Sequence, residues 1–269
     1  VADQFALQWF ESRLSEVKTE VEKLFAEFRL SEALKTIYSL IWDDFCSWYL
    51  EWVKPGFDQP ISADVYNKTV AYFTELLQLL HPYMPFISEE IYHLLEERKE
   101  DLCVKQFTPV ASANGIRLAE GELLKQSITA LRDARVKNRI KPKDEISLHI
   151  ETGNPDKYDN IRSILGRQVN TPTIHIAGTA EKGNISLVIG KDKFYIHSTL
   201  PADHAAQKEQ LEKDLVYQKG FLASIAKKLS NERFVQNAKP EVVELERKKM
   251  TDAEAKIKAI EESLAQLVG

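Results

Sequence analysis

A run of basic residues between Leu131 and Lys143 is the segment whose side chains most clearly suit a defined chemistry. It contains one acid and six cations, which are Arg132, Arg135, Lys137, Arg139, Lys141 and Lys143. On a helix, the three arginines lie at i, i+3 and i+7 and are expected to form one ridge. Lys141 and Lys143 flank the proline and are expected in an extended exit strand. Guanidinium groups on such a ridge suit RNA phosphates and base edges. A solvated helix face is the alternative explanation.

A second set of candidate RNA-binding cations lies near the C-terminus. It consists of Lys227, Lys228, Arg233, Arg247 and Lys248. Residues 203–269 contain twelve lysines or arginines and twelve acids, so the net charge of this segment is near zero. Any contact with RNA phosphates must therefore come from these clustered side chains. The alternative is that they are ordinary solvated helix positions, with Glu244 or Glu246 neutralising some of them.

Three tryptophans on one predicted helix, Trp42, Trp48 and Trp52, offer a different chemistry. Aromatic rings can stack on RNA bases that have been splayed out of their helix. These tryptophans, however, belong to a wide apolar stripe at helical spacing, and such a stripe usually faces a core. We therefore expect all three in the core of a helical bundle.

Catalytic chemistry finds no support in the residue pattern. The sequence has no glycine-rich phosphate loop and no zinc-binding or metalloprotease spacing, and its six histidines are scattered. The acid pairs Asp43–Asp44, Glu89–Glu90 and Glu96–Glu97 are adjacent in sequence. Neighbouring helical residues point about 100° apart, so the two members of a pair cannot share one substrate atom. We expect these acids on solvated helix faces or near helix N-termini, and we expect a non-catalytic chain without a cofactor.

The composition is typical of a globular, mainly helical protein, with 43% hydrophobic and 29% charged residues and only ten glycines. A net charge of −5 argues against indiscriminate binding of nucleic acid. No apolar stretch approaches the ~18 residues of a membrane span, and residues 1–5 lack the features of an export signal. The sequence starts without Met and directly in helical periodicity. These features predict a piece of a longer cytoplasmic protein. In the reducing cytoplasm, Cys46 is expected to be a buried free thiol.

Helical periodicity predicts five helices in the first half of the chain. Apolar residues recur at helical spacing over residues 5–28, 34–52, 66–80, 87–95 and 119–138. Ser62 is expected to cap the third of these helices, and Pro85 to occupy the first turn of the fourth.

The pattern changes after Pro142 to that of a small α/β module. Strands are predicted at residues 146–150, 173–177, 185–189 and 193–197, and one helix at 155–167. Residues 190–192 are expected to form the hairpin turn between the last two strands. A module of roughly 55 residues has a small core, so we expect it to lean on its neighbours.

Two heptad-like runs follow, over residues 211–229 and 243–267. A break of about ten residues that includes Pro240 lets the chain reverse. The runs are therefore expected to pair with each other as an antiparallel two-helix coiled coil, an arm ~40 Å long. Pairing of each run with a second molecule is the alternative.

Two stretches resemble a known family. Residues 80–91 (LHPYMPFISEEI), downstream of residues 42–49 (WDDFCSWY), resemble the anticodon-binding helical bundle of class I aminoacyl-tRNA synthetases in the valine/isoleucine/leucine group. Residues 229–238 (LSNERFVQNA) resemble the C-terminal coiled coil of the valyl enzymes within that group. One departure is that Pro240 lies one residue later than is usual. The catalytic motifs of the family, HIGH-like and KMSKS-like, do not occur here, and neither does a recognisable editing domain.

The resemblance implies a three-part organisation and a role in tRNA recognition. Residues 1–143 would be the anticodon-binding helical bundle, 144–200 a small α/β linker module, and 201–269 a coiled-coil arm on the outer corner of the tRNA. The parent enzyme would use ATP and Mg²⁺ in a catalytic domain N-terminal to this segment. Its implied partner is the valine tRNA, and we expect a monomer without membrane contact. The alternative is a scaffold whose coiled coil joins protein partners without binding RNA.

Overall fold

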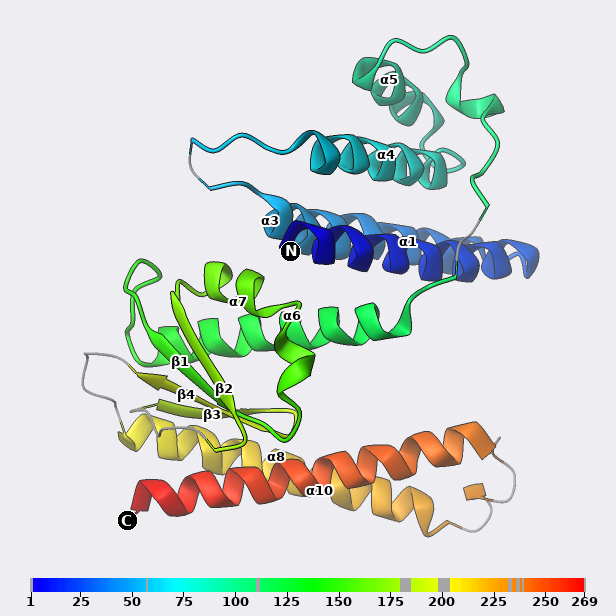
Figure 1. The fold of residues 1–269 in the computed structure, drawn as a ribbon. Helices are drawn as coiled ribbons and strands as arrows, with labels where there is room; N and C mark the ends of the chain where they lie inside the picture. Colours follow the sequence, from blue (N-terminus) through cyan, green and yellow to red (C-terminus); the bar gives the residue numbers. More distant parts are fainter. Residues whose placement is uncertain are drawn as a thin grey trace. The chain divides into compact units, whose positions relative to one another are not determined.

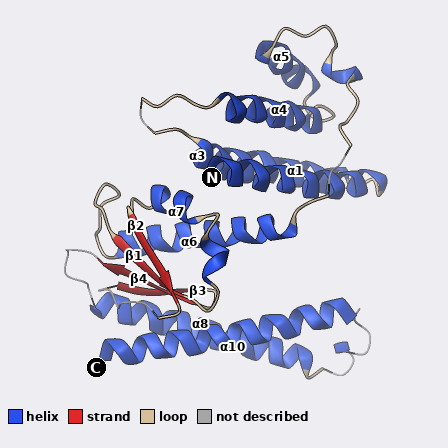
Figure 2. Ribbon diagram, in the orientation of Figure 1, coloured by secondary structure: helices blue, strands red, loops and turns tan. Residues whose placement is uncertain are grey.

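The protein is mainly helical, with one small mixed sheet (Figure 2). The computed structural model describes residues 2–56, 58–109, 112–179, 185–197, 204–231, 234–235, 238 and 240–268. The chain forms two compact units, Val1–Lys125 and Gln126–Gly269, and the division falls inside helix α6 (Gly115–Lys137). The predicted three-part division at residues 143 and 200 stays a prediction. None of the described helices has the length and apolar character that a bilayer crossing requires.

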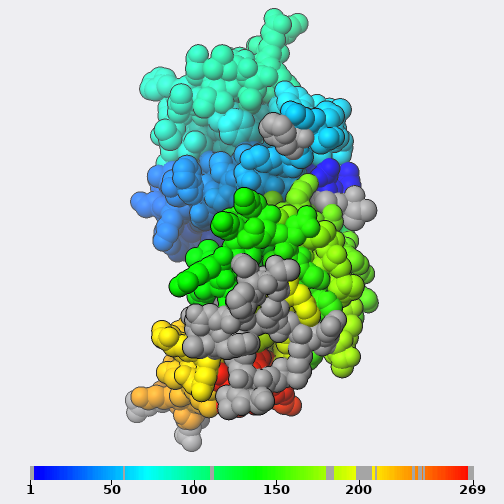
Figure 3. Space-filling view, turned by 90° about the vertical axis from the view of Figure 1, so that its left-hand side faces the viewer, coloured from blue at the N-terminus to red at the C-terminus, as the bar shows by residue number. Residues whose placement is uncertain are grey.

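The first unit contains the predicted helices. Its elements are α1 (Ala2–Ala26), α2 (Leu30–Ser39), the π-helical η1 (Leu40–Tyr49), α3 (Leu50–Val53), α4 (Ala63–Leu80), α5 (Pro85–Leu95), the 3-10 helix η2 (Leu102–Val104) and the start of α6. The Ser62 hydroxyl accepts a hydrogen bond from the Val65 amide at 3.3 Å, which confirms the predicted cap of α4. Pro85 begins α5, as predicted. In the space-filling view, the α4 and α5 residues (cyan to blue-green) lie against the blue helices (Figure 3).

Aromatic side chains fill the core of this unit. The rings of Trp9 and Trp52 lie 4.6 Å apart, and those of Phe10 and Tyr49 lie 4.8 Å apart. Gly121 of α6 packs directly on this cluster, because a Cβ atom at that position would lie 2.1 Å from Nε1 of Trp9. The expectation of a core tryptophan is confirmed for Trp52, which is fully buried.

The second unit holds a four-stranded sheet in the order β2-β1-β4-β3. Its strands are β1 (Ser147–Glu151), β2 (Thr173–Ala177), β3 (Ile185–Ile189) and β4 (Asp192–His197). β1 pairs with β2 in parallel, and the other pairs are antiparallel. The predicted hairpin turn is confirmed at Gly190, whose φ of 60° suits glycine. The helix predicted over residues 155–167 is in fact two pieces, η3 (Pro155–Tyr158) and α7 (Arg162–Gln168).

The two faces of the sheet contact different elements. Tyr158 of η3 packs edge-on against Phe194 of β4, which places η3 on the face of Phe194. Side chains alternate along a strand, so Lys193 lies on the opposite face. Lys193 forms an ion pair with Glu262, which belongs to the long helix α10 (Pro240–Val268). The α/β module therefore leans on a neighbouring helix, as the sequence predicted.

The helices α8 (His204–Leu229) and α10 lie side by side and run in opposite directions (Figure 1). Burial along them repeats every seven residues, at Leu211, Gln218 and Ile225 of α8 and at Glu246, Ala253 and Ile260 of α10. Ion pairs of 2.7 Å between Lys219 and Glu261 and of 3.7 Å between Lys228 and Glu246 connect the two helices. The two heptad-like runs therefore pair with each other within this chain.

Candidate nucleic-acid interface

Arg135 organises the connection that leads from α6 to β1. The residue is 4% exposed, and its guanidinium donates hydrogen bonds to the carbonyl oxygens of Val169 at 2.8 Å and Asp144 at 2.5 Å. It also donates to the carbonyl oxygens of Lys141 and, at 3.2 Å, of Pro142. Burial lowers the pKa of Arg135, and the charge of Asp144 offsets part of this effect. Arg135 thus gathers main-chain carbonyls inside the unit and does not present its charge at the surface.

The expected ridge of three arginines does not form. α6 ends at Lys137, so Arg139 lies beyond the helix, while Arg135 faces inwards towards the end of α7. Arg132 is exposed and donates a hydrogen bond of 2.8 Å to the side-chain oxygen of Gln168. The spacing was right for a ridge, but helical spacing alone does not show where a helix ends or which carbonyls lie opposite it.

Arg139 occupies the position that ends α6. Its amide donates to the carbonyl of Val136 at 3.1 Å, and the amide of Ile140 donates to the carbonyl of Arg135 at 2.9 Å. This pair of hydrogen bonds is a Schellman motif, in which the residue at C′ adopts a left-handed conformation. Arg139 accordingly has a φ of 56°, where glycine is the usual residue. The side chain is exposed at the exit of the helix.

The exit from α6 is a turn and not the expected extended strand. The Asp144 amide donates to the carbonyl of Lys141 at 3.0 Å, and the Asp144 carboxylate accepts from the Lys141 amide at 3.0 Å. Pro142 takes the second position of this turn, which its fixed φ favours. Lys137, Lys141 and Lys143 are exposed here. Together with Arg132 and Arg139 they form the α6 exit cluster, whose RNA contact stays a prediction.

The cations of the α8–α10 pair are also mostly at the surface. Lys227, Arg247 and Lys248 are exposed, while Arg233 lies outside the described residues. Lys228 lies 3.7 Å from the buried carboxylate of Glu246, which also accepts a hydrogen bond of 2.7 Å from Lys249. The hydrogen bond from Lys249 is the main cause that lowers the pKa of Glu246. Glu246 therefore neutralises part of the charge of Lys228, which the sequence left open. RNA contact by the exposed cations stays a prediction.

An exposed apolar stripe runs along α2 and η1, and the sequence prediction missed it. Its members, four residues apart, are Leu30, Leu34, Tyr38 and Trp42, and the last two are each 59% exposed. The rings of Tyr38 and Trp42 are nearly parallel, with their centroids 6.3 Å apart. The prediction of Trp42 in the core was wrong. Trp42 is two residues from both Leu40 and Asp44, which are buried, so it points to the other side of the helix.

Asp44 is buried, and the expectation of a solvated carboxylate was wrong. Its two oxygens accept hydrogen bonds from Nε of Arg13 at 2.8 Å and from Nζ of Lys125 at 2.5 Å. Although burial acts in the opposite direction, the hydrogen bond and charge of Asp44 raise the pKa of Arg13. Lys125 also lies 4.7 Å from the ring of Trp9. Asp44 therefore joins η1 to α1 and α6 within the first unit.

Strand pairing brings together three histidines that are distant in sequence. The ring of His149 on β1 lies 4.6 Å from that of His175 on β2 and 4.3 Å from that of His197 on β4. On α5, His93 lies beside Glu89, four residues earlier. A search of the sequence for Glu and His four residues apart would have found the Glu89–His93 pair.

Both free cysteines are exposed, so the expectation of a buried Cys46 was wrong.

Two families match most of the chain. Residues 8–151, more than half of the chain, match the anticodon-binding domain of tRNA ligase. Residues 203–268 match the valyl tRNA synthetase tRNA binding arm. The two matches follow one another along the chain, and between them they include the α6 exit cluster and the α8–α10 pair.

Curated relatives are similar over almost the whole chain. A valine–tRNA ligase from Phocaeicola vulgatus is 40% identical over 98% of this chain and 30% of its own length. One from Parabacteroides distasonis is 38% identical over 99% of this chain, and one from Enterococcus faecalis is 31% identical over 97%. The chain spans about 30% of the length of the curated relatives it matches.

Proposed function

This chain belongs to the anticodon-binding domain family of tRNA ligases, and we propose that it is the tRNA-recognition region of a valine–tRNA ligase. The observation that carries the proposal is the succession of an anticodon-binding domain and a valyl-type tRNA-binding arm along one chain. In this proposal the parent polypeptide is a cytoplasmic monomer. Its remaining part contains the catalytic and editing domains. That part joins valine to its tRNA with ATP and Mg²⁺, and the present segment contributes recognition without a catalytic residue or cofactor.

The proposed division of labour follows the chemistry of tRNA. Anticodon bases are unstacked, so their edges and faces are available to residues 1–143, the proposed bundle. The outer corner offers shape and phosphates, which a long charged arm can follow without reading sequence. Residues 201–269 would form this arm as an antiparallel two-helix coiled coil, and the seven-residue repeat of burial supports that assignment. Residues 144–200 would link the two.

The exposed pair of Tyr38 and Trp42 supports a base-binding role for the first unit. A contiguous exposed apolar patch, such as the stripe that contains these two rings, commonly marks a contact surface, and an unstacked base is a suitable partner for the rings. Base stacking on an aromatic side chain contributes roughly 1–3 kcal/mol. Trp42→Ala should therefore weaken tRNA binding by about ten-fold, whereas Tyr66→Ala, which removes an equally accessible ring from α4, should not. Equal losses in a filter-binding assay would contradict this role.

The exposed cations support phosphate contacts in the second unit. The α6 exit cluster retains five surface cations after Arg135 is set aside as a structural residue. The arm adds Lys227, Arg247 and Lys248. Each cation that contacts a phosphate releases counterions, so affinity should fall as salt rises, with a log–log slope of roughly −0.7 per contact.

A salt titration of binding to valine tRNA tests the electrostatic part of the proposal. The chain should bind the tRNA with affinity that falls steeply between ~50 and ~200 mM salt. The triple variant K141A/K143A/R132A and the double variant R247A/K248A should each bind more weakly, with a shallower slope. A matched control is K54A, which removes an exposed cation at the end of α3. Unchanged slopes in both charge variants would show that these side chains are ordinary solvated surface residues that do not contact RNA.

A scaffold that joins protein partners through the coiled coil remains the competing function. The exposed apolar side chains of α8 and α10, such as Val216 and Leu245, are the observation that favours it. A scaffold of this kind should dimerise through residues 203–269 and should not bind RNA. Light scattering at increasing concentration, with and without valine tRNA, distinguishes the two functions, because tRNA recognition predicts a monomer that forms a one-to-one complex.

A further inference from the structure

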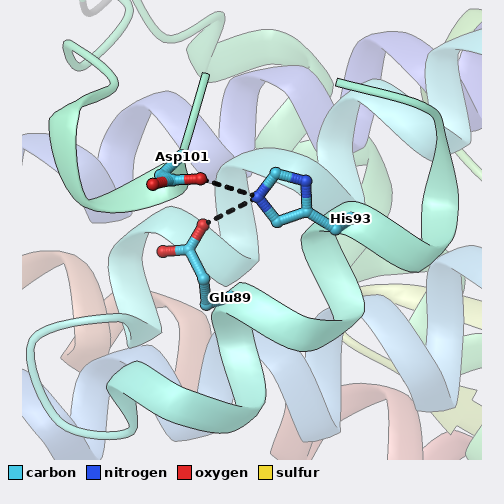
Figure 4. Close-up of side chains that lie close together, drawn as sticks. All are labelled: Glu89, His93 and Asp101. Carbon is cyan, nitrogen blue, oxygen red and sulfur yellow. Dashed lines mark hydrogen bonds and ion pairs between the residues drawn. The ribbon is translucent and has the colours of Figure 1, made fainter. Parts of the chain in front are cut away.

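Three side chains of the first unit converge beside α5, and none of them is among the residues proposed to bind RNA. Glu89 and His93 are one turn apart on α5, and Asp101 lies immediately before η2 (Figure 4). Nε2 of His93 lies 3.2 Å from a carboxylate oxygen of Glu89 and 3.1 Å from one of Asp101. One ligand atom from each of the three residues lies within 4.8 Å of the other two.

The surrounding core holds these three groups in place. Tyr92, next to His93, and Leu102, next to Asp101, are both buried in one small cluster with Leu77. The Glu89 carboxylate accepts hydrogen bonds from the backbone amides of Leu102 at 2.6 Å and Cys103 at 3.2 Å. Glu89 is therefore partly buried, and its carboxylate binds the amides of the first two residues of η2. These contacts fix the cluster between two segments that the loop of residues 96–100 separates in sequence.

A hydrogen bond from His93 does not account for the position of its Nε2 between two carboxylates. Nε2 of an imidazole carries at most one hydrogen, yet in His93 it faces two carboxylate oxygens at nearly equal distances. A single N–H cannot make two well-aligned hydrogen bonds at once. A divalent cation can bond to all three atoms and can balance both carboxylates.

The two distances from His93 Nε2 to the carboxylate oxygens are compatible with a metal site, and the two oxygens lie within 4.8 Å of each other. Zinc bonds to nitrogen and oxygen ligands at about 2.0–2.1 Å in a tetrahedral arrangement, which places neighbouring ligand atoms roughly 3.3 Å apart. The observed separations of 3.2 and 3.1 Å are close to this value. A set of one imidazole and two carboxylates suits zinc, whereas magnesium prefers oxygen ligands and octahedral geometry.

We propose that Glu89, His93 and Asp101 form a zinc-binding site that fastens the segment of η2 to α5. Water would complete the tetrahedron, and the backbone amides that already bind Glu89 would orient its carboxylate. His81 stays outside the ligand set, because its Nε2 is 4.0 Å from Glu89 and its Nδ1 bonds Ser88 at 2.8 Å. None of the three residues is proposed to contact tRNA, so either proposal can fail without the other.

Calorimetric titration of the full chain with Zn²⁺ tests the site. Both exposed cysteines are first replaced by serine, so that thiolates do not bind the metal. The parent should then bind one equivalent of Zn²⁺, and its melting temperature should rise in Zn²⁺ and fall back on chelation. His93→Gln and Asp101→Asn should each weaken binding by at least roughly 10–100-fold. Glu90→Gln, which removes the exposed neighbouring carboxylate, should leave binding unchanged.

Cobalt provides an independent readout of the geometry. Co²⁺ bound by the parent should give the strong visible absorption of a tetrahedral complex, and His93→Gln should lose it. Circular dichroism shows whether each variant is folded, and the exposed Asp101 allows the comparison to be made even if His93→Gln is unfolded. No saturable binding by the parent, or equal binding by the parent and Asp101→Asn, would overturn the proposal.

Discussion

Gly121 sets how closely α6 approaches the aromatic core of the first unit. A Cβ atom there would lie 2.1 Å from Nε1 and 2.2 Å from Cδ1 of Trp9, and the indole is fully enclosed. Gly121→Ala should therefore overpack the core and lower the free energy of unfolding by about 1–3 kcal/mol. Urea unfolding followed by tryptophan fluorescence measures the change.

Gly115 provides the matched control for this substitution. It lies on the same helix, and a Cβ atom there would meet nothing within 4 Å. Gly115→Ala should leave stability unchanged or raise it slightly, because alanine has the higher helix propensity. If both variants lost the same stability, the close contact with Trp9 would not be the cause.

Arg139 allows charge and backbone strain to be separated. A non-glycine residue in the left-handed region costs about 1–2 kcal/mol, and Arg139 has a φ of 56°. Arg139→Gly should relieve this strain and raise stability, while tRNA binding should weaken and its salt slope should become shallower by roughly 0.7. Arg139→Ala removes the same charge but keeps the strain, so it should weaken binding without stabilising. A stabilised Arg139→Gly with unchanged binding would remove Arg139 from the proposed interface.

At the scale of elements, Glu89 joins α5 to η2 in a way that depends on pH. Partial burial alone would raise the pKa of Glu89, but the amides of Leu102 and Cys103 lower it overall. A carboxyl group whose folded pKa is depressed stabilises the protein above its unfolded pKa, near 4.3. That stability is lost as pH falls through the folded pKa.

The pH dependence of Glu89→Gln tests this link. In the presence of a chelator, which removes any metal contribution, the variant should be less stable than the parent at pH 7. The difference should shrink progressively below about pH 4 as Glu89 becomes protonated in the parent. Thermal unfolding across this range gives the comparison, and a difference independent of pH would contradict the role of the ionised carboxylate.

The elements themselves were largely predictable, because periodicity and capping residues are local signals. Ser62 and Pro85 marked the starts of α4 and α5, and alternation located the strands. The π-helical turns of η1 were not predictable, because its buried residues, Leu40, Asp44, Phe45 and Tyr49, have the spacing of an ordinary helix. The exposure of Trp42 was missed because a stripe of many aromatic residues shows that a core exists without showing which ring leaves it.

The candidate site was less predictable, since its residues depend on contacts that are distant in sequence. The six cations of the α6 exit look alike in the sequence. Arg135 is buried because carbonyl groups at the end of α7 and in the turn after α6 accept its hydrogen bonds. Arg132 and Arg139 are exposed. The Glu89–His93 spacing was visible, but Asp101 joins it only through the packing of Leu102.

At the scale of the whole molecule, the proposed function requires that this chain recognises the anticodon. The most direct measurement is equilibrium binding, at one fixed low salt concentration, to a valine tRNA transcript and to the same transcript with an altered anticodon. Loss of even one base contact should weaken binding to the altered transcript by roughly ten-fold, since each stacked base contributes about 1–3 kcal/mol. Equal affinity for the two transcripts would contradict anticodon recognition by this chain.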